Sequence, residues 1–113
     1  MYVAFYSPEF PEQLARYSQL RNKIKSAKNR VLHDPFYRTE RLGKKGQYDL
    51  RGLRSVHVGD GQFVIVFAVC EEYLKKFPDT DRVCRACLSS QNPKAVIFLT
   101  VGPHDLAYRT VVR

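Results

Sequence analysis

The sequence has no tryptophan, one methionine and three cysteines among its 113 residues. Three cysteines are too few for the disulfide framework of a small secreted domain, and no apolar run approaches the ~20 residues that cross a bilayer. The opening stretch, MYVAFYSPEF, lacks the basic start and long apolar core of a secretory signal. We therefore expect a cytoplasmic protein with no membrane partner, and the length predicts a single domain over residues 1–113.

Acidic residues are scarce in one part of the chain. Residues 13–54 hold twelve Lys and Arg but only three acids, a net charge of +9, whereas the whole chain carries +8. Residues 1–12 carry −2, and residues 55–113 carry +1. Such a basic block raises the local concentration of polyanions, of which nucleic acid is the commonest. A solvated helix face matched to an acidic protein partner explains the same charge equally well.

Hydrophobic periodicity predicts the N-terminal elements. Residues 2–6 are aromatic and β-branched and indicate a strand, and Ser7 followed by Pro8 is typical of a helix N-cap. A helical region follows and ends near His33, where an Asp-Pro pair disfavours continuation. Its apolar face consists of residues three or four positions apart: Leu14, Tyr17, Leu20, Ile24, Ala27 and Val31. The pattern leaves open one long helix or a helical hairpin broken near Ser18.

The remainder of the chain is predicted to be mostly strands. Further strands are expected at residues 53–58, 62–70, 95–101 and, as a short edge strand, 108–112. Gly59-Asp60-Gly61 provides the positive φ angles of a tight hairpin, and FVIVFAV, apolar on both faces, indicates a central strand covered on both sides. Residues 35–50 are expected to be a loop, and residues 71–94, polar with two prolines, an insertion.

This order of elements predicts an α+β domain. The N-terminal helices are expected to pack on one face of a small mixed or antiparallel β-sheet, in the order β-α-α-β-β-β.

Two histidines lie at the ends of predicted strands. Alternation along its strand places His57 opposite two valines, so His57 projects from the open face of the sheet if the valines meet the helices. His104 follows a buried strand, in a loop that begins Gly-Pro. Near Arg54, Arg109 and Tyr108, two imidazoles suffice for RNA cleavage, because one accepts the 2′-hydroxyl proton while another acid protonates the 5′-oxygen. A hydrogen-bonded surface histidine and a guanidinium that binds a carboxylate are the alternative interpretation.

The cysteines raise the question of a metal. Cys84-x-x-Cys87 is half of a zinc-ribbon ligand set, and Cys70 offers a third thiolate, but no fourth ligand has a suitable place. A Cys84–Cys87 redox pair and plain small core residues are the other interpretations. We predict no metal and no other cofactor.

The segments GLRSVHVGDGQFVIVFAV and VIFLTVGPHDLAYR resemble the RelE/ParE superfamily of toxins from type II toxin–antitoxin systems. They are most similar to the branch of YafQ-type messenger-RNA interferases. The shared pattern is a Gly-x-Arg that opens a His-containing strand, a hairpin, a long apolar strand, and Gly-x-His with an aromatic residue four positions later. The residues that match it are Gly52, Arg54, His57, Gly102, His104 and Tyr108. The likeness is strong over residues 50–70 and 95–109, and the insertion at residues 71–94 departs from it.

The resemblance implies a ribosome-dependent mRNA endoribonuclease, a toxin that a cognate antitoxin protein holds inactive. Transferred to this sequence, it makes His57 and His104 the catalytic acid and base. It also makes Arg54 a phosphate-stabilising group and Tyr108 the aromatic residue beside the scissile nucleotide. The basic residues expected to contact mRNA or ribosomal RNA are Arg16, Lys23, Arg30, Lys44, Lys45 and Arg109.

A second hypothesis belongs to a different functional class. Superfamily members that inhibit DNA gyrase share the fold without the RNA-cutting residues, so fold alone does not fix the target. The alternative is therefore a non-catalytic protein that blocks a protein target such as gyrase, or binds nucleic acid without cleaving it. The resemblance also leaves a toxin homodimer open.

Overall fold

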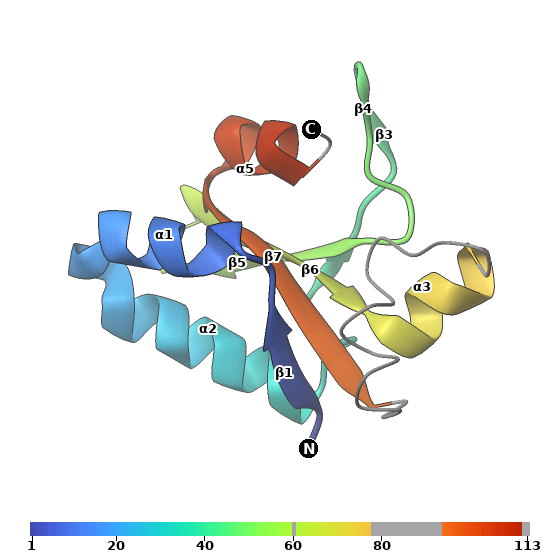
Figure 1. Ribbon diagram of the computed structural model, residues 1–113, viewed down its shortest axis with the longest axis horizontal. Coiled ribbons are helices and arrows are strands. Elements are labelled where there is room, and N and C mark those ends of the chain that lie inside the picture. The colour runs from blue at the N-terminus through green and yellow to red at the C-terminus, as the bar shows by residue number, and fades with distance from the viewer. Residues whose placement is uncertain (60, 78–93, 112–113) are drawn as a thin grey trace.

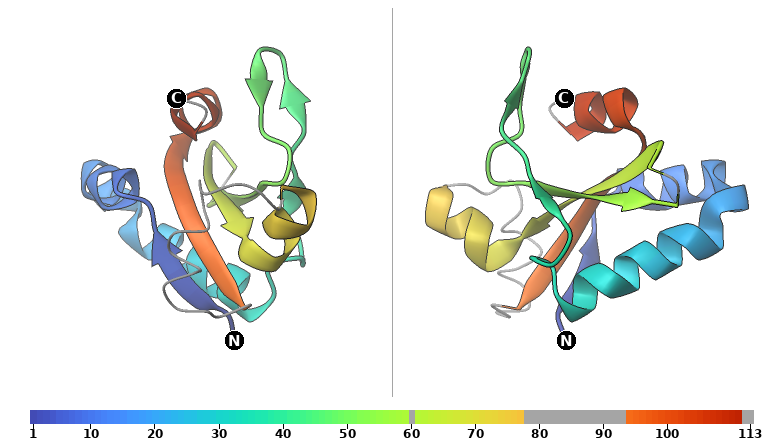
Figure 2. Two further views of the ribbon diagram at one scale, coloured as in Figure 1. Left: turned by 45° about the vertical axis from the view of Figure 1, so that its right-hand side comes forward. Right: turned by 180° about the vertical axis from the view of Figure 1, so that it is seen from behind.

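The computed structural model describes residues 1–59, 61–77 and 94–111. At its centre lies a five-stranded mixed sheet in the order β1-β7-β6-β5-β2 (Figure 1). β1 runs parallel to β7, and the other neighbouring pairs are antiparallel. The strands are β1 (Val3–Tyr6), β2 (Glu40–Arg41), β5 (Arg54–Val58), β6 (Phe63–Val69) and β7 (Ala95–Pro103). A two-stranded hairpin, β3 (Lys44–Lys45) and β4 (Tyr48–Asp49), projects from the body (Figure 2).

The described residues form four α-helices, α1 (Glu9–Arg16), α2 (Arg21–His33), α3 (Cys70–Lys76) and α5 (His104–Val111). A 3-10 turn, η1 (Ser18–Leu20), separates α1 from α2, so the helical region is broken at the place that the sequence left open. α2 ends at His33, as predicted. Ser7 does not cap α1, because its hydroxyl instead donates a hydrogen bond of 2.6 Å to the carbonyl of Leu99.

The sheet has a buried cluster on each face. On one face α1 and α2 contribute Phe10, Ile24 and Val31, which pack against alternate residues of the strands, among them Val56 and Phe67. The α+β class and the packing of the N-terminal helices against the sheet are therefore confirmed. The alternation along β6 carries Ile65, Phe67 and Val69 to this face and Val64, Val66 and Ala68 to the other. β6 is thus covered on both sides, as its sequence predicted.

The second face of the sheet is not open, contrary to the sequence-based expectation. Leu50 and Leu53 from the segment before β5, Tyr73 from α3 and Tyr108 from α5 pack on it. Figure 2 shows α3 and the projecting hairpin on the side of the sheet opposite α1. Apolar side chains on both faces of β6 require this second cover, since they would otherwise lie in water.

Two local expectations were wrong, and the expected insertion contains a helix. Residues 104–111 form α5 rather than a loop and an edge strand, because Ala107, Tyr108 and Val111 lie on one helix face and bury it. Residues 70–76 form α3, so the expected insertion begins with a helix and its residues 78–93 lie outside the described ranges. The expected loop at residues 35–50 includes the short strands β2, β3 and β4. The hairpin turn is as predicted at Gly59 and Gly61, whose φ angles are +65° and +98°.

No helix among the described residues is long and apolar enough to cross a membrane.

The phenol of Tyr2 connects the N-terminus to α3, and this contact predicts a pH-dependent stability. Its hydroxyl donates a hydrogen bond of 2.7 Å to Glu71 Oε1, which together with burial raises the pKa of Tyr2 from 10.0 to about 12. Because this pKa is higher in the folded chain, the stabilisation is complete below pH 10 and is lost as the pH rises toward 12. Tyr2→Phe is expected to lower the free energy of unfolding by about 1 kcal/mol at neutral pH. Urea denaturation should show this difference shrinking between pH 10 and pH 12; a constant difference would contradict it.

Candidate functional site

The register of three neighbouring strands brings His57 and His104 together. His57 of β5 is paired with Val64 of β6, which is paired in turn with Gly102 of β7. His104 begins α5 two residues after Gly102, and its ring centroid lies 5.4 Å from that of His57, with 57° between the ring planes. The expectation that the two histidines meet is therefore confirmed.

Each imidazole has a distinct environment. His57 is exposed, and its neighbours Val56 and Val58 are buried against the helices on the opposite face. His104 is partly buried, and its Nδ1 lies 3.2 Å from the main-chain carbonyl oxygen of Gln62. Because a carbonyl oxygen only accepts, Nδ1 carries a proton in this contact, and Nε2 is the nitrogen that can gain or lose one.

Tyr108 lies one helical turn after His104 on the same face of α5. Its ring centroid is 6.1 Å from that of His104, and the planes meet edge to face at 75°. Tyr108 is buried, so it supports His104 from the core side and presents little of its ring to solvent.

Two hydrogen bonds hold the end of β7, one to α5 and one to α1. The hydroxyl of Thr100 donates a hydrogen bond of 3.2 Å to the carbonyl of Ala107. The amide of Val101 donates one of 2.9 Å to Oε1 of the buried Gln13, which belongs to α1. A register shift between β6 and β7 leaves Leu99 out of the pairing just before these residues. The end of β7, from which His104 emerges, is thus held by contacts on both faces of the sheet.

Arg54 is not placed with the histidine pair. By strand alternation it shares a face with Val56, whereas His57 projects from the other face. Its Nε lies 2.9 Å from Glu72 Oε2 and its Nη1 3.2 Å from the hydroxyl of Thr39. The guanidinium is therefore bound to a carboxylate, which is the alternative that the sequence had left open for this residue.

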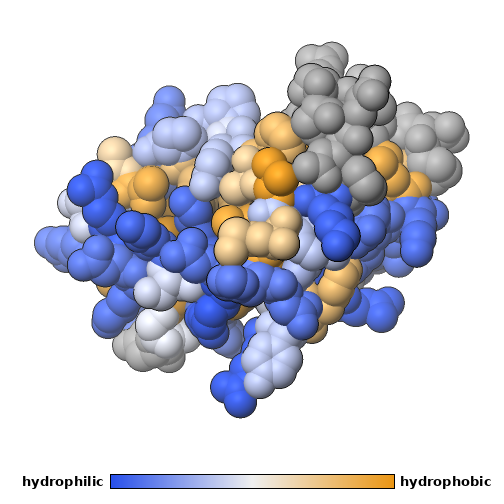
Figure 3. Space-filling model, turned by 90° about the horizontal axis from the view of Figure 1, so that it is seen from below, coloured by the Kyte–Doolittle hydropathy of each residue, from blue (hydrophilic) through white to orange (hydrophobic). Residues whose placement is uncertain are grey.

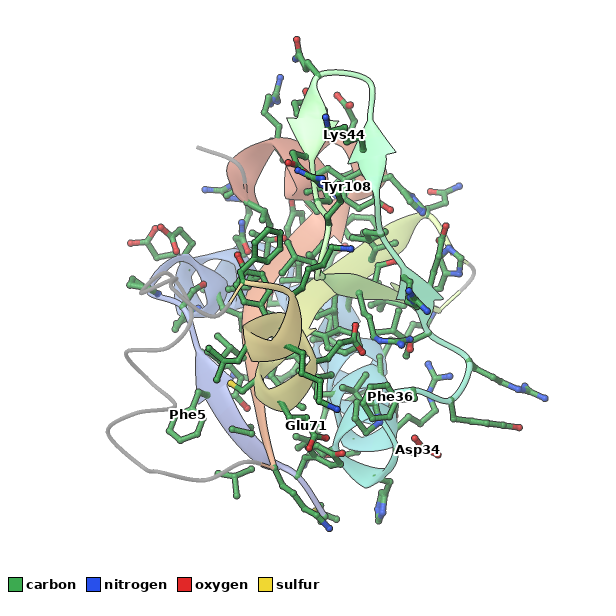
Figure 4. All side chains as sticks on the ribbon, turned by 90° about the vertical axis from the view of Figure 1, so that its right-hand side faces the viewer. Phe5, Asp34, Phe36, Lys44, Glu71 and Tyr108 are labelled. Carbon is green, nitrogen blue, oxygen red and sulfur yellow. The ribbon has the colours of Figure 1, made fainter. Side chains whose placement is uncertain are left out.

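The six predicted RNA-contacting residues fall into separate groups. Lys23 and Arg30 of α2 line one shallow depression beside Gly59, and Nη2 of Arg30 lies 3.4 Å from the main-chain oxygen of His57. Arg16 and Arg109 line a second cavity, of about 400 Å³, which also contains the carboxylates of Glu9 and Glu12. Lys44 is exposed on the hairpin, well apart from Phe36 and Asp34 in Figure 4, and the side chain of Lys45 lies outside the description.

Arg51 is neutralised locally. Its guanidinium hydrogen-bonds the carboxylate of Asp49, which lowers the pKa of Asp49 to about 2 and raises that of Arg51. Figure 3 shows that hydrophilic side chains cover much of the face seen from below, with several apolar areas between them. Of the basic groups, the one that contains Arg30 directly contacts the strand of His57.

The described residues contain no group of three or more His, Cys, Asp or Glu that could hold a metal ion. Cys70 is buried and is disulfide-bonded, so it is not a free thiol. Cys84 and Cys87 lie outside the described residues.

Sequence reasoning missed two contacts of the histidine pair, the carbonyl of Gln62 at His104 and the guanidinium of Arg30 at His57. Every residue has a main-chain carbonyl, so the sequence does not indicate which one accepts a hydrogen bond from His104. The contact of Arg30 depends on how α2 crosses the sheet, which the sequence does not indicate either.

Comparison of the chain with protein-family models finds no match, and neither the curated proteins nor the solved structures provide one.

Proposed function

We propose that the protein is an endoribonuclease in which His57 and His104 transfer the protons of RNA cleavage. The observation that carries this proposal is the contact of the two imidazoles, 5.4 Å between centroids, at the solvent-facing end of the sheet. General acid and base groups act from within about 3 Å of the proton they move, so two rings at this separation can serve the two sides of one phosphodiester.

The hydrogen bond to Gln62 favours His104 as the base. With its Nδ1 proton held by the carbonyl, neutral His104 has an unprotonated Nε2 that can accept the 2′-hydroxyl proton. The 2′-oxygen then bonds to phosphorus, the bond from phosphorus to the 5′-oxygen breaks, and protonated His57 gives its proton to that oxygen. The products are a 2′,3′-cyclic phosphate and a 5′-hydroxyl.

The biological setting belongs to the same proposal. A chain with a net charge of +8 and a basic depression beside the histidine strand suits a polyanionic substrate such as mRNA on the ribosome. Such an activity in the cytoplasm requires control, and the proposal includes a cognate antitoxin protein with acidic residues that face the basic segment.

One observation favours the non-catalytic alternative. Arg54, the expected phosphate-stabilising group, is paired with Glu72 of α3 and also donates a hydrogen bond to the hydroxyl of Thr39. Without a guanidinium at the reacting phosphate, the same surface would bind nucleic acid or a protein target without cutting RNA.

Induced expression distinguishes the two functions. The wild type is expected to arrest growth and to produce new primer-extension stops in translated messages, and the His57→Ala/His104→Ala double variant is expected to do neither. Gln19→Ala, an exposed position in η1, serves as the control and should behave as the wild type. Arrest that persists in the double variant, with intact messages, would refute the ribonuclease and support the binder.

A further inference from the structure

The segment between α2 and β2, residues 34–39, is a hydrogen-bonded turn, here called the aromatic loop. Asp34 Oδ1 accepts a hydrogen bond of 3.1 Å from the amide of Phe36, and the hydroxyl of Thr39 donates one of 2.7 Å to the carbonyl of Pro35. Arg38 has φ of +55°, the only positive φ of a non-glycine residue among those described. Left-handed backbone at such a residue costs free energy, and strain of this kind is concentrated at functional sites.

The aromatic loop presents two aromatic rings to solvent, each with a guanidinium against it. Phe36 is 43% exposed and Tyr37 is 63% exposed. Cζ of Arg54 lies 4.8 Å from the ring centroid of Phe36, and Cζ of Arg38 lies 5.3 Å from that of Tyr37. The apolar surface of these rings is exposed to water in the folded chain. A ligand that stacks on them buries this surface, and the burial contributes hydrophobic free energy to binding.

A cavity connects the aromatic loop to the strand of His57. Tyr37 and Arg38 line about 380 Å³ together with Arg30 and Val56, the residue before His57. Within the described part of the chain, β2 pairs only with Arg54 and Ser55, so the outer edge of β5 carries no strand beside Val56–Val58. Arg30 crosses this edge, with Nη2 3.4 Å from the main-chain oxygen of His57. A bound ligand strand that extends from the two histidines across this edge of β5 therefore passes Arg30 and reaches the cavity.

We propose that the aromatic loop is a binding subsite for single-stranded RNA, in which a base stacks on Tyr37 and the adjoining phosphates contact Arg30 and Arg38. This inference depends on the proposed function, because it places a nucleotide that flanks the scissile one. Unpaired bases are bound on exposed aromatic rings beside basic groups, whereas a duplex hides the base faces. Asp34, whose Oδ1 accepts a hydrogen bond from the Phe36 amide, is the one carboxylate among the described residues that line the cavity, and the two guanidiniums of Arg30 and Arg38 outnumber it.

The test measures binding separately from cleavage. Binding of a short fluorescein-labelled oligoadenylate is followed by anisotropy in the His57→Ala/His104→Ala background, so that the RNA stays intact. Adding Tyr37→Ala is expected to weaken binding about 5- to 150-fold, the size of one lost base stack, whereas Tyr37→Phe should keep most of the affinity. Arg38→Gln should instead lower the salt dependence, by about 0.7 in the slope of log affinity against log salt.

Tyr6→Ala is the matched control. Tyr6 is 44% exposed and has the ammonium of Lys28 4.7 Å from its ring centroid, but it lies on β1 at the opposite edge of the sheet. Its replacement should leave the affinity for oligoadenylate unchanged.

The outcomes separate this subsite from the proposed ribonuclease. Unchanged RNA affinity in Tyr37→Ala, an equal loss in Tyr6→Ala, or no binding at all would overturn the subsite and leave the aromatic loop to a protein partner. Cleavage of a translated mRNA by the wild type, measured by primer extension in translating extracts, tests the nuclease independently. Tyr37-dependent binding without cleavage would refute the nuclease and retain the subsite.

Discussion

Alanine in place of His104 alone is expected to slow cleavage of mRNA in a translating extract by about 10²- to 10⁴-fold, the usual contribution of one general acid or base. His57→Ala should have an effect of the same order. The expectation follows from the pairing of the rings 5.4 Å apart, because a cleavage step that needs a proton removed and a proton added fails when either partner is missing. Cleavage rates are measured by primer extension over time at one enzyme concentration.

The double variant tests whether the two histidines act as a unit. Groups that act in one step are strongly non-additive, so His57→Ala/His104→Ala is expected to be little slower than the worse single variant. Multiplicative losses would indicate two independent roles and contradict the acid–base pair.

His104→Asn separates chemistry from structure. The asparagine amide can donate to the Gln62 carbonyl as Nδ1 does, but it cannot exchange a proton near neutral pH. This variant should unfold at the same urea concentration as the wild type and yet be as slow as His104→Ala. Recovery of the rate in His104→Asn would show that His104 has only a positioning role.

The parts of the fold that the sequence predicts are those with local signals. The Asp-Pro pair after His33 ends α2, and the glycines at 59 and 61 form the hairpin turn. Alternation places His57 opposite two valines, and those valines do face the helices. In each case the local structure is determined by one residue type or by the alternation of a strand over a few positions. Contacts with distant residues are not needed to predict it.

The errors arise where distant contacts decide. Residues 104–111 are short enough to fit a strand or a helix, and packing of Tyr108 on the sheet selects the helix. Glu72, which binds Arg54, lies on a helix that the sequence analysis had assigned to an insertion. The position of Arg54 itself was accessible, because alternation already separates Arg54 from His57. The resemblance implies a phosphate-stabilising role for Arg54, whereas strand alternation places its side chain on the opposite face of β5 from His57.

Phe98→Ala is expected to have the largest effect on stability, a loss of about 3–5 kcal/mol in the free energy of unfolding. Phe98 is 0% exposed in β7 and contacts the rings of Phe10 and Phe67, with centroids 5.8 and 6.2 Å away. Its removal leaves a cavity between α1 and the sheet. The sheet cannot shift to fill this cavity, because β7 is paired with β1 on one side and with β6 on the other. Urea denaturation followed by circular dichroism measures the loss, and a value below about 1 kcal/mol would contradict the packing.

Tyr37→Ala is the matched aromatic truncation for this measurement, because Tyr37 is 63% exposed and should change the free energy of unfolding by less than about 0.5 kcal/mol. Phe98→Ala also shows how a loss of stability alone changes the result of the growth assay. A chain that has lost 3–5 kcal/mol has a much larger unfolded fraction in the cell, so Phe98→Ala should weaken growth arrest through a lower amount of folded protein. When rates are divided by the folded amount, Phe98→Ala should cleave mRNA nearly as fast as the wild type, whereas His104→Ala should not.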